Sequence, residues 1–210
     1  VFDIETACCA PSFDEASETV QNSFLYFCER KFPKELNDQG VNSLFLEKAA
    51  LMPEFADVVC ISIGTIKNNE YKIVTLLNEN NDSTEILSKF ASFCDKLKPN
   101  FILCGYNILN FDIPFLVKHM IQKGITVPKK LNMWGIKPWE RSVFDIFEFW
   151  KGHGSYLPSL LMVSSFLGCG NPKEKINGSH VGPLFYGTSE LASSKKEGLD
   201  IIKTYCESDV

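Results

Sequence analysis

Two carboxylates stand close together in the first six residues, VFDIET, where a single apolar residue separates Asp3 from Glu5. The apolar neighbours predict a buried strand, and a strand places residues i and i+2 on one face, about 6.6 Å apart. Like charges repel there, and burial adds to the cost. The pattern therefore predicts a cation between the two acids, and a solvated edge strand is the alternative.

A third acid, Asp112, belongs to the segment GYNILNFDIPFL. An apolar strand stops at Tyr106, a polar turn follows, and Asp112 falls in the first turn of the next predicted helix, where the helix dipole tolerates a negative charge. An ordinary aspartate at a helix start is the alternative. Further along, Asp145 ends a predicted strand, and it is either a support for a site or a surface residue.

The last acid is found in YCESDV, where Tyr205 and Asp209 are four residues apart and share one face of a predicted helix. Tyr205 continues the apolar stripe of that helix, so a core tyrosine is the alternative. Asp209 on the same inward face needs a partner, because a buried acid is costly alone. No Lys or Arg occupies positions 202, 205 or 206 to provide one.

In this order, the three segments resemble the three motifs of the DEDD superfamily of 3′–5′ exonucleases, in its tyrosine-bearing subgroup. The likeness is to the proofreading exonuclease domain of family B DNA polymerases and to the stand-alone predicted exonucleases related to it. It extends over residues 50–64, 145–168 and 177–186, and leaves out chiefly an insertion at 7–48. The positions of the second motif that match are Gly105, Tyr106, Asn107, Phe111, Asp112 and Pro114.

The resemblance implies a two-metal phosphodiester hydrolysis with two divalent cations, Mg²⁺ or Mn²⁺, which prefer oxygen ligands. It implies that Asp3 bridges both ions, that Glu5 and Asp209 complete the site of the water-activating ion, and that Asp112 helps to hold the other ion. Tyr205 would orient the attacking water, because a tyrosine that titrates near pH 10 is a poor general base at neutral pH.

The resemblance also implies substrate contacts at Thr6, Asn107 and Phe111, with an aromatic ring against the terminal bases. A core aromatic is the alternative for Phe111. Another subgroup of the superfamily carries His in place of the tyrosine. Positions 204 and 205 are Thr and Tyr, and the three histidines lie elsewhere in the sequence, which disfavours that variant.

Composition predicts one domain over residues 1–210, since 210 residues with 45% hydrophobic content can bury a sizeable core. The net charge of −5 argues against a basic coat that binds nucleic acid by phosphate neutralisation alone. Eight cysteines stand in apolar contexts without a CxxC pair, which predicts reduced thiols, no disulfide partner and a cytoplasmic protein. No apolar run is long enough to span a membrane. We expect the native chain to be longer at both ends.

Periodicity predicts the elements that must position these acids. A strand in VFDIE is followed by an inserted helix over 12–31, with Ser12 and Glu15 as a capping box. Two strands, 57–68 and 71–78, flank a turn at Asn68-Asn69-Glu70. The later elements are a helix after Asp82, a strand over 101–106, a helix ended by Gly124, a strand over 141–147, and helices over 158–167 and 196–210. We expect a ribonuclease H-like α/β fold, a five-stranded mixed sheet with helices on both faces.

The predicted function is the metal-dependent release of nucleoside 5′-monophosphates from a 3′ end, with single-stranded DNA as the expected substrate. The alternatives are an exonuclease of the same fold that acts on RNA and a catalytically silent nucleic-acid-binding module. A phosphatase of the haloacid dehalogenase type is disfavoured because Glu5 stands where those enzymes need a second Asp. A separate polymerase or repair protein as a partner remains open.

Overall fold

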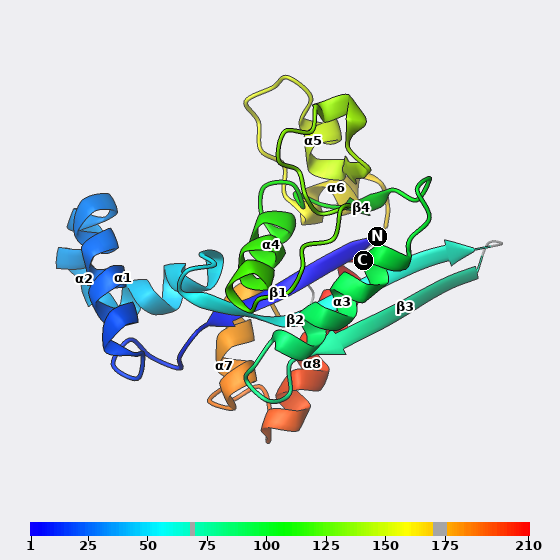
Figure 1. The fold of residues 1–210 in the computed structure, drawn as a ribbon. Helices are drawn as coiled ribbons and strands as arrows, with labels where there is room; N and C mark the ends of the chain where they lie inside the picture. The colour runs from blue at the N-terminus through cyan, green and yellow to red at the C-terminus, as the bar shows by residue number, and fades with distance from the viewer. Residues whose placement is uncertain (68–69, 170–175) are drawn as a thin grey trace.

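The computed structural model describes residues 1–67, 70–169 and 176–210 (Figure 1). The chain forms a mixed α/β structure in which helices cover both faces of a central sheet. The strands are β1 Phe2–Cys8, β2 Ala56–Lys67, β3 Glu70–Leu77, β4 Leu103–Gly105 and β5 Val143–Asp145. The helices are α1 Glu18–Lys31, α2 Pro33–Lys48, α3 Thr84–Lys96, α4 Asp112–Gln122, α5 Ile146–Lys151, α6 Leu160–Phe166, α7 Val181–Tyr186 and α8 Lys195–Ser208. Short 3₁₀ turns are η1 Ala49–Leu51, η2 Pro138–Glu140 and η3 Gly178–His180.

The three long strands form an antiparallel sheet in the order β1-β2-β3. Phe2 lies opposite Ile63, and Lys67 lies opposite Glu70 at the end of the hairpin between β2 and β3. This pairing confirms the predicted hairpin. Two residues of its predicted turn, Asn68 and Asn69, lie outside the described residues.

The prediction of one five-stranded sheet is wrong, because β4 and β5 pair in parallel as a separate two-stranded sheet. Val1 exchanges backbone hydrogen bonds with Gly64 of β2, and bonding alternates along an antiparallel strand, so the N–H of Ile4 points away from β2. That N–H is donated to the carboxylate of Asp112 at 3.1 Å. β4 nevertheless lies beside β1, since a side chain at Gly105 would begin only 2.6 Å from the carbonyl oxygen of Phe2. The Asp112 side chain therefore accepts the Ile4 N–H, which in a continuous sheet would be donated to a carbonyl of β4.

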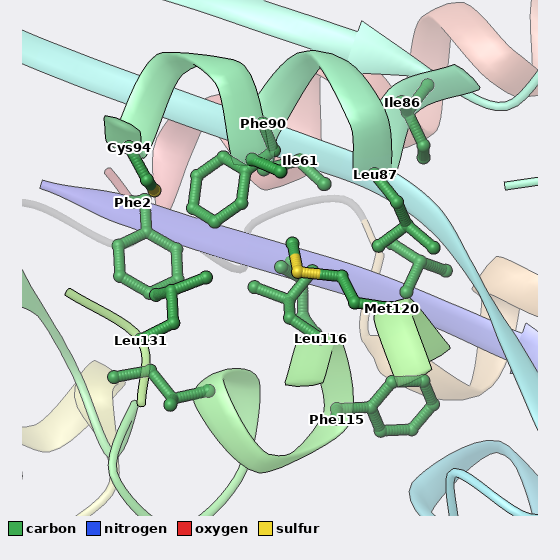
Figure 2. Packing of buried hydrophobic residues seen from close by; sticks show 14 of the residues in the cluster. Phe2, Ile61, Ile86, Leu87, Phe90, Cys94, Phe115, Leu116, Met120 and Leu131 are labelled. Atoms are coloured by element: carbon green, nitrogen blue, oxygen red, sulfur yellow. The ribbon is translucent and has the colours of Figure 1, made fainter. Parts of the chain in front are cut away.

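The main core lies on the face of β1 that carries Phe2 and Ile4, beneath α3 and α4 (Figure 2). The apolar stripe of α3 buries Leu87, Phe90 and Cys94 there, as its 3.6-residue spacing predicts. The Phe2 and Phe90 rings pack with their centroids 5.3 Å apart. These contacts pack β1 against α3.

A second core fills the opposite face, where Ala7 of β1 packs against helices α7 and α8. Gly198 of α8 permits a close approach, because a Cβ at this position would lie 2.4 Å from the carbonyl oxygen of Leu184 in α7. The side chains of β1 alternate between the two cores. Asp3 and Glu5 therefore point toward α8, on the same face as Ala7.

The insertion after β1 folds into the helical pair α1–α2, which projects from the sheet at the end away from α5 and α6 (Figure 1). Its own core contains Phe24 and Phe45, whose rings meet edge to face at 5.2 Å. The helix begins later than predicted, at Glu18. Ser12 donates to the Glu15 carboxylate at 2.9 Å, whereas the side chain of Ser17 caps the helix. The strand also runs on to Cys8, so the insertion starts after it.

The predicted strand over 101–106 shortens to β4, and Phe101 and Ile102 are exposed. The strand predicted over 141–147 similarly shortens to β5, because Asp145 caps α5. The predicted helices after Asp82, before Gly124, near 158–167 and near 196–210 correspond to α3, α4, α6 and α8. None of the helices among the described residues is both long and apolar enough to cross a bilayer.

Candidate active site

Three of the predicted acids form one cluster between β1 and α8. The carboxylate oxygens that Asp3, Glu5 and Asp209 can offer lie within 4.8 Å of one another, and all three residues are half-buried. A bulge between Glu5 and Thr6, where β2 contributes Val59 as an extra residue, shifts the β1–β2 register beside the cluster. The strand and the helix terminus thus bring together side chains from the two ends of the described chain.

Helix α8 is held in the register that places Asp209 beside β1. The hydroxyl of Ser194 caps its N-terminus by accepting the N–H of Glu197 at 3.2 Å. Near its other end, the Thr75 hydroxyl of β3 donates to the Glu207 carboxylate at 2.6 Å. Asp209 itself is the residue that ends the helix. The helix is therefore held at both ends, and its position places Asp209 beside β1.

The cluster is electrostatically strained in the absence of a cation. Burial raises the pKa of Asp3 well above its ordinary value, and the carboxylates of Asp112, Glu5 and Asp209 raise it further. The thiol of Cys206 opposes this shift by donating to Asp3 Oδ2 at 3.6 Å. A cation placed among these oxygens would remove the repulsion that raises the pKa.

Asp112 lies apart from the three clustered acids but close enough to act on Asp3. It is the first residue of α4, is 2% exposed, and accepts the N–H of Ile4 in β1. Burial raises its pKa to about 7, with a smaller contribution from the charge of Asp145, while its two backbone hydrogen bonds lower it. The structure therefore places the fourth predicted acid against the edge of the strand that carries the first two.

Asp145 organises the turn that delivers Asp112. Its carboxylate is buried and accepts four backbone N–H groups at 2.8–3.4 Å, from Asn107, Leu109, Phe147 and Glu148. Two of these donors belong to the 106–111 turn and two to the first turn of α5. Asn107 adopts a left-handed backbone conformation with φ of 61°, which asparagine tolerates better than most residues. Asp145 is thus a support for the site, the first of its two predicted readings.

Tyr205 lies in the second core and is only 6% exposed. Burial and the charges of Glu5, Asp209 and Asp3 raise the pKa of its hydroxyl far above the ordinary value. The hydroxyl consequently remains protonated throughout the physiological range. It can orient a neighbouring group by hydrogen bonding, but it cannot serve as a proton acceptor in its ionised form.

A cavity of about 430 Å³ opens beside Glu5, between β1, η1 and α7. Two predicted substrate contacts, Thr6 and Phe111, line it, whereas Asn107 does not. The Thr6 hydroxyl donates to the carbonyl of Ala50 at 2.7 Å, so toward a ligand it can act only as an acceptor. Phe111 is half-buried and packs on Phe115 with ring centroids 5.5 Å apart, so it contributes to the main core, and its contact with a substrate stays a prediction.

The sequence did not single out two groups that the structure places at the site. One is Cys206, which contacts Asp3. In the sequence, this cysteine is indistinguishable from an ordinary residue of the second core. The other is the wall that the insertion contributes to the cavity through Ala10 and Leu46. Because Cys206 directly follows Tyr205, the sequence could have indicated that this cysteine lies near the site. Nothing in the sequence of the insertion indicated that it lines the cavity.

Residues 45–210 match the sequence pattern of the RNase H superfamily. The chain belongs to this superfamily. The match covers Asp112, Tyr205 and Asp209 and begins after the segment that carries Asp3, Glu5 and Thr6. Searches of curated proteins and of solved structures each returned no significant match.

Membership of the RNase H superfamily indicates a nuclease, a hydrolase that acts on nucleic acids. Nucleases of the RNase H type typically use divalent metal ions, and the Asp3, Glu5 and Asp209 cluster offers the oxygen donors that such ions require. The fold is accordingly ribonuclease H-like. Its described strands form one three-stranded sheet, β1-β2-β3, and one two-stranded sheet, β4-β5.

Proposed function

We propose that this protein is a metal-dependent 3′–5′ exonuclease that releases nucleoside 5′-monophosphates, with single-stranded DNA as its substrate. The observation that carries the proposal is the convergence of Asp3, Glu5 and Asp209 within 4.8 Å, with Asp112 close enough to raise the pKa of Asp3. The tyrosine of the corresponding subgroup, Tyr205, lies in the same electrostatic environment.

The residues fit two divalent cations by the chemistry of their donors. The cluster offers carboxylate oxygens, the ligands that Mg²⁺ and Mn²⁺ prefer. The neighbouring sulfur of Cys206 is a poor ligand, since burial raises the pKa of its thiol well above the ordinary value and only the thiolate binds metals well. Asp3, Glu5 and Asp209 would hold the cations together with Asp112. Bound there, the ions would activate a water and stabilise the leaving 3′ oxygen.

The protein groups have separate tasks around the scissile phosphate. Asp3 is fixed by its position in a rigid strand and by the Cys206 thiol. The neutral hydroxyl of Tyr205 would orient the attacking water, because its raised pKa keeps the proton in place. Asp145 acts at a distance by holding the turn that leads to Asp112.

The cavity beside Glu5 would receive the terminal nucleotide. Its volume of about 430 Å³ lies in the range of small-molecule sites, roughly 300–1,000 Å³. Its walls combine apolar side chains such as Leu51 and Phe111 with Glu5 and the Thr6 oxygen. A cavity of this size beside the acidic cluster favours action on the last nucleotide of a strand.

The test is a degradation assay on 5′-labelled single-stranded DNA and RNA, with Mg²⁺, with Mn²⁺ and with chelator. We expect a ladder of successively shorter labelled products that requires metal and is lost in Asp3→Asn. The matched control is Asp38→Asn, which removes an exposed carboxylate from α2. A ladder on RNA alone would reassign the substrate. Metal-dependent binding without cleavage of either strand would favour the silent binding module.

A further inference from the structure

A group of exposed apolar side chains lies on β5, α5, α6 and the loop that joins the two helices, outside the site described above. Its members are between 36% and 79% exposed, although they are large and mostly aromatic. The α5–α6 strip consists of Phe144, Phe149, Trp150, Tyr156, Met162 and Phe166. Exposed apolar patches on this scale mark interaction surfaces rather than random exposure.

Contacts between side chains join the members of the strip in three pairs. Phe144 and Phe149 pack with ring centroids 5.5 Å apart, and Trp150 meets Phe166 edge to face at 5.7 Å. At the other end, the Tyr156 hydroxyl donates to the sulfur of Met162 at 3.3 Å. Helices α5 and α6 lie next to each other beside β4 (Figure 1).

The strip is joined to the turn that delivers Asp112. The hydroxyl of Tyr106 in that turn donates to the carbonyl of Pro158 at 2.6 Å, two residues after Tyr156. The ring of Tyr106 also packs edge to face on Phe147 of α5, with centroids 5.7 Å apart. The strip is therefore tied to the 106–111 turn, whose last residue, Phe111, lines the cavity.

The charges around the strip favour a polyanion over an acidic or neutral protein surface. Residues 149–169 contain no Asp or Glu, although the chain carries 26 acids and a net charge of −5. Lys151 and His153 are the ionisable side chains of that stretch with basic character. The nearest acid in the sequence is Glu148 of α5, whose carboxylate accepts the side-chain N–H of Asn110 at 3.2 Å. Within residues 149–169, a phosphate backbone would therefore meet two basic side chains and no carboxylate of that stretch.

We propose that the α5–α6 strip is a stacking platform for the bases upstream of the terminal nucleotide in a single strand. This inference rests on the proposed exonuclease function and extends it to substrate length and strandedness. Aromatic faces stack on any base, so the platform binds without sequence preference, as stepwise degradation requires. A duplex would not use it, because its bases already stack on one another. The platform thus selects a single strand several nucleotides long.

The test compares two variants, Phe149→Ser and Phe166→Ser, with the wild type. Both side chains are at least 70% exposed, so their removal leaves the cores intact. We measure the initial rate of terminal cleavage on a ten-nucleotide DNA strand and on the same strand with abasic sites at all but its last three positions. For the intact strand, we expect each variant to raise KM about tenfold without changing kcat. For the abasic strand, we expect the KM of the wild type to rise at least as much as that of a variant on the intact strand, and the KM of each variant to equal that of the wild type.

The control variant is Tyr26→Ser, which removes an exposed ring from α1 in the insertion. It should leave KM for both strands unchanged. Unchanged KM values in Phe149→Ser and Phe166→Ser, with cleavage intact, would overturn the platform alone. If the same variants instead change the sedimentation of the protein, the strip binds a second copy, and the platform is overturned as well. Failure of the wild type to cleave any strand would overturn the proposed function and the platform with it.

Discussion

Two carboxylate sites lie close together in this protein, and their negative charges have different surroundings. Asp145, at the end of β5, accepts four backbone N–H groups within 3.4 Å. Asp3 in β1 receives only a weak thiol donor by comparison, and desolvation together with the charges of the neighbouring acids raises its pKa well above the ordinary value. Asp112 is intermediate between Asp145 and Asp3, because it accepts two backbone hydrogen bonds and yet burial raises its pKa to about 7.

The difference shows how one residue type can serve structure in one place and chemistry in another. Backbone donors compensate the charge of Asp145 within the fold itself, so its carboxylate stabilises the turn without a ligand. Asp3 instead faces the carboxylates of Asp112, Glu5 and Asp209, and a cation can compensate their combined charge. Backbone donors around Asp145 and acidic neighbours around Asp3 distinguish the two roles. The two sites should therefore respond in opposite directions when a charge is removed.

The largest expected effect is on activity, from Asp3→Asn. Loss of the central carboxylate should lower the rate of cleavage at least about a thousandfold, because several kcal/mol of transition-state stabilisation depend on the metal ions. The same substitution should raise the melting temperature of the protein in chelator, since it relieves repulsion with Asp112, Glu5 and Asp209. Steady-state kinetics and thermal unfolding check both parts. An Asp3→Asn protein with wild-type activity would refute the site.

Asp145→Asn should produce the reverse pattern in stability. An amide has one acceptor oxygen for four N–H groups, and unsatisfied buried donors should lower the free energy of unfolding by about 2–4 kcal/mol. Urea denaturation in chelator measures this loss directly. Asp200→Asn, on the exposed side of α8, is the control and should change stability little. Equal stability of Asp145→Asn and the wild type would mean that its four hydrogen bonds do not hold the turn.

Tyr205→Phe tests the acid cluster without altering its charge. We expect kcat to fall about tenfold, because a water-orienting hydrogen bond is lost while all four carboxylates remain. Metal titration by calorimetry should give the wild-type affinity. Tyr71→Phe, which removes an exposed hydroxyl from β3, serves as the matched control. An unchanged kcat in Tyr205→Phe would show that the hydroxyl takes no part in the reaction.

The smallest effect concerns the pH dependence of stability in the metal-free protein. The folded protein retains the proton of Asp112 up to about pH 7, whereas an unfolded chain releases it near pH 4. The folded state binds more protons in this interval, so the free energy of unfolding should fall as the pH rises from about 4 to 7. Asp112→Asn should flatten this decline by at least about 1 kcal/mol. Parallel slopes in the two proteins, measured by denaturation at several pH values, would contradict the raised pKa.

Helices α1, α3, α4, α6 and α8 and the order of the acidic motifs could be predicted from the sequence because they depend on local patterns, whereas α2, α5 and α7 were not predicted. The apolar stripe of α3 and the i, i+4 spacing of Tyr205 and Asp209 determine which side chains share a face, whatever the surrounding structure. The hairpin of β2 and β3 followed from a polar turn between β-rich runs. These features need little information about the rest of the chain.

The parts that could not be predicted depend on contacts between distant residues. The division of the sheet follows from a bond between Ile4 and Asp112, 108 residues apart, which no strand propensity encodes. The start of α1 depended on which of two serines caps the helix, and both have a suitable sequence context. The Cys206 contact and the cavity wall from the insertion arise only when separate elements pack together.

The hydrogen bond from Ile4 to Asp112 also makes one backbone amide a spectroscopic reporter of the site. Its proton is shared with a carboxylate whose protonation and cation occupancy change the strength of that bond. The nitrogen and proton shifts of Ile4 should therefore move when Asp112 titrates and again when Mg²⁺ is added. Isotope-labelled protein would thus allow each event at the acidic cluster to be followed from a single resonance in the buried strand, without a substrate or an engineered probe.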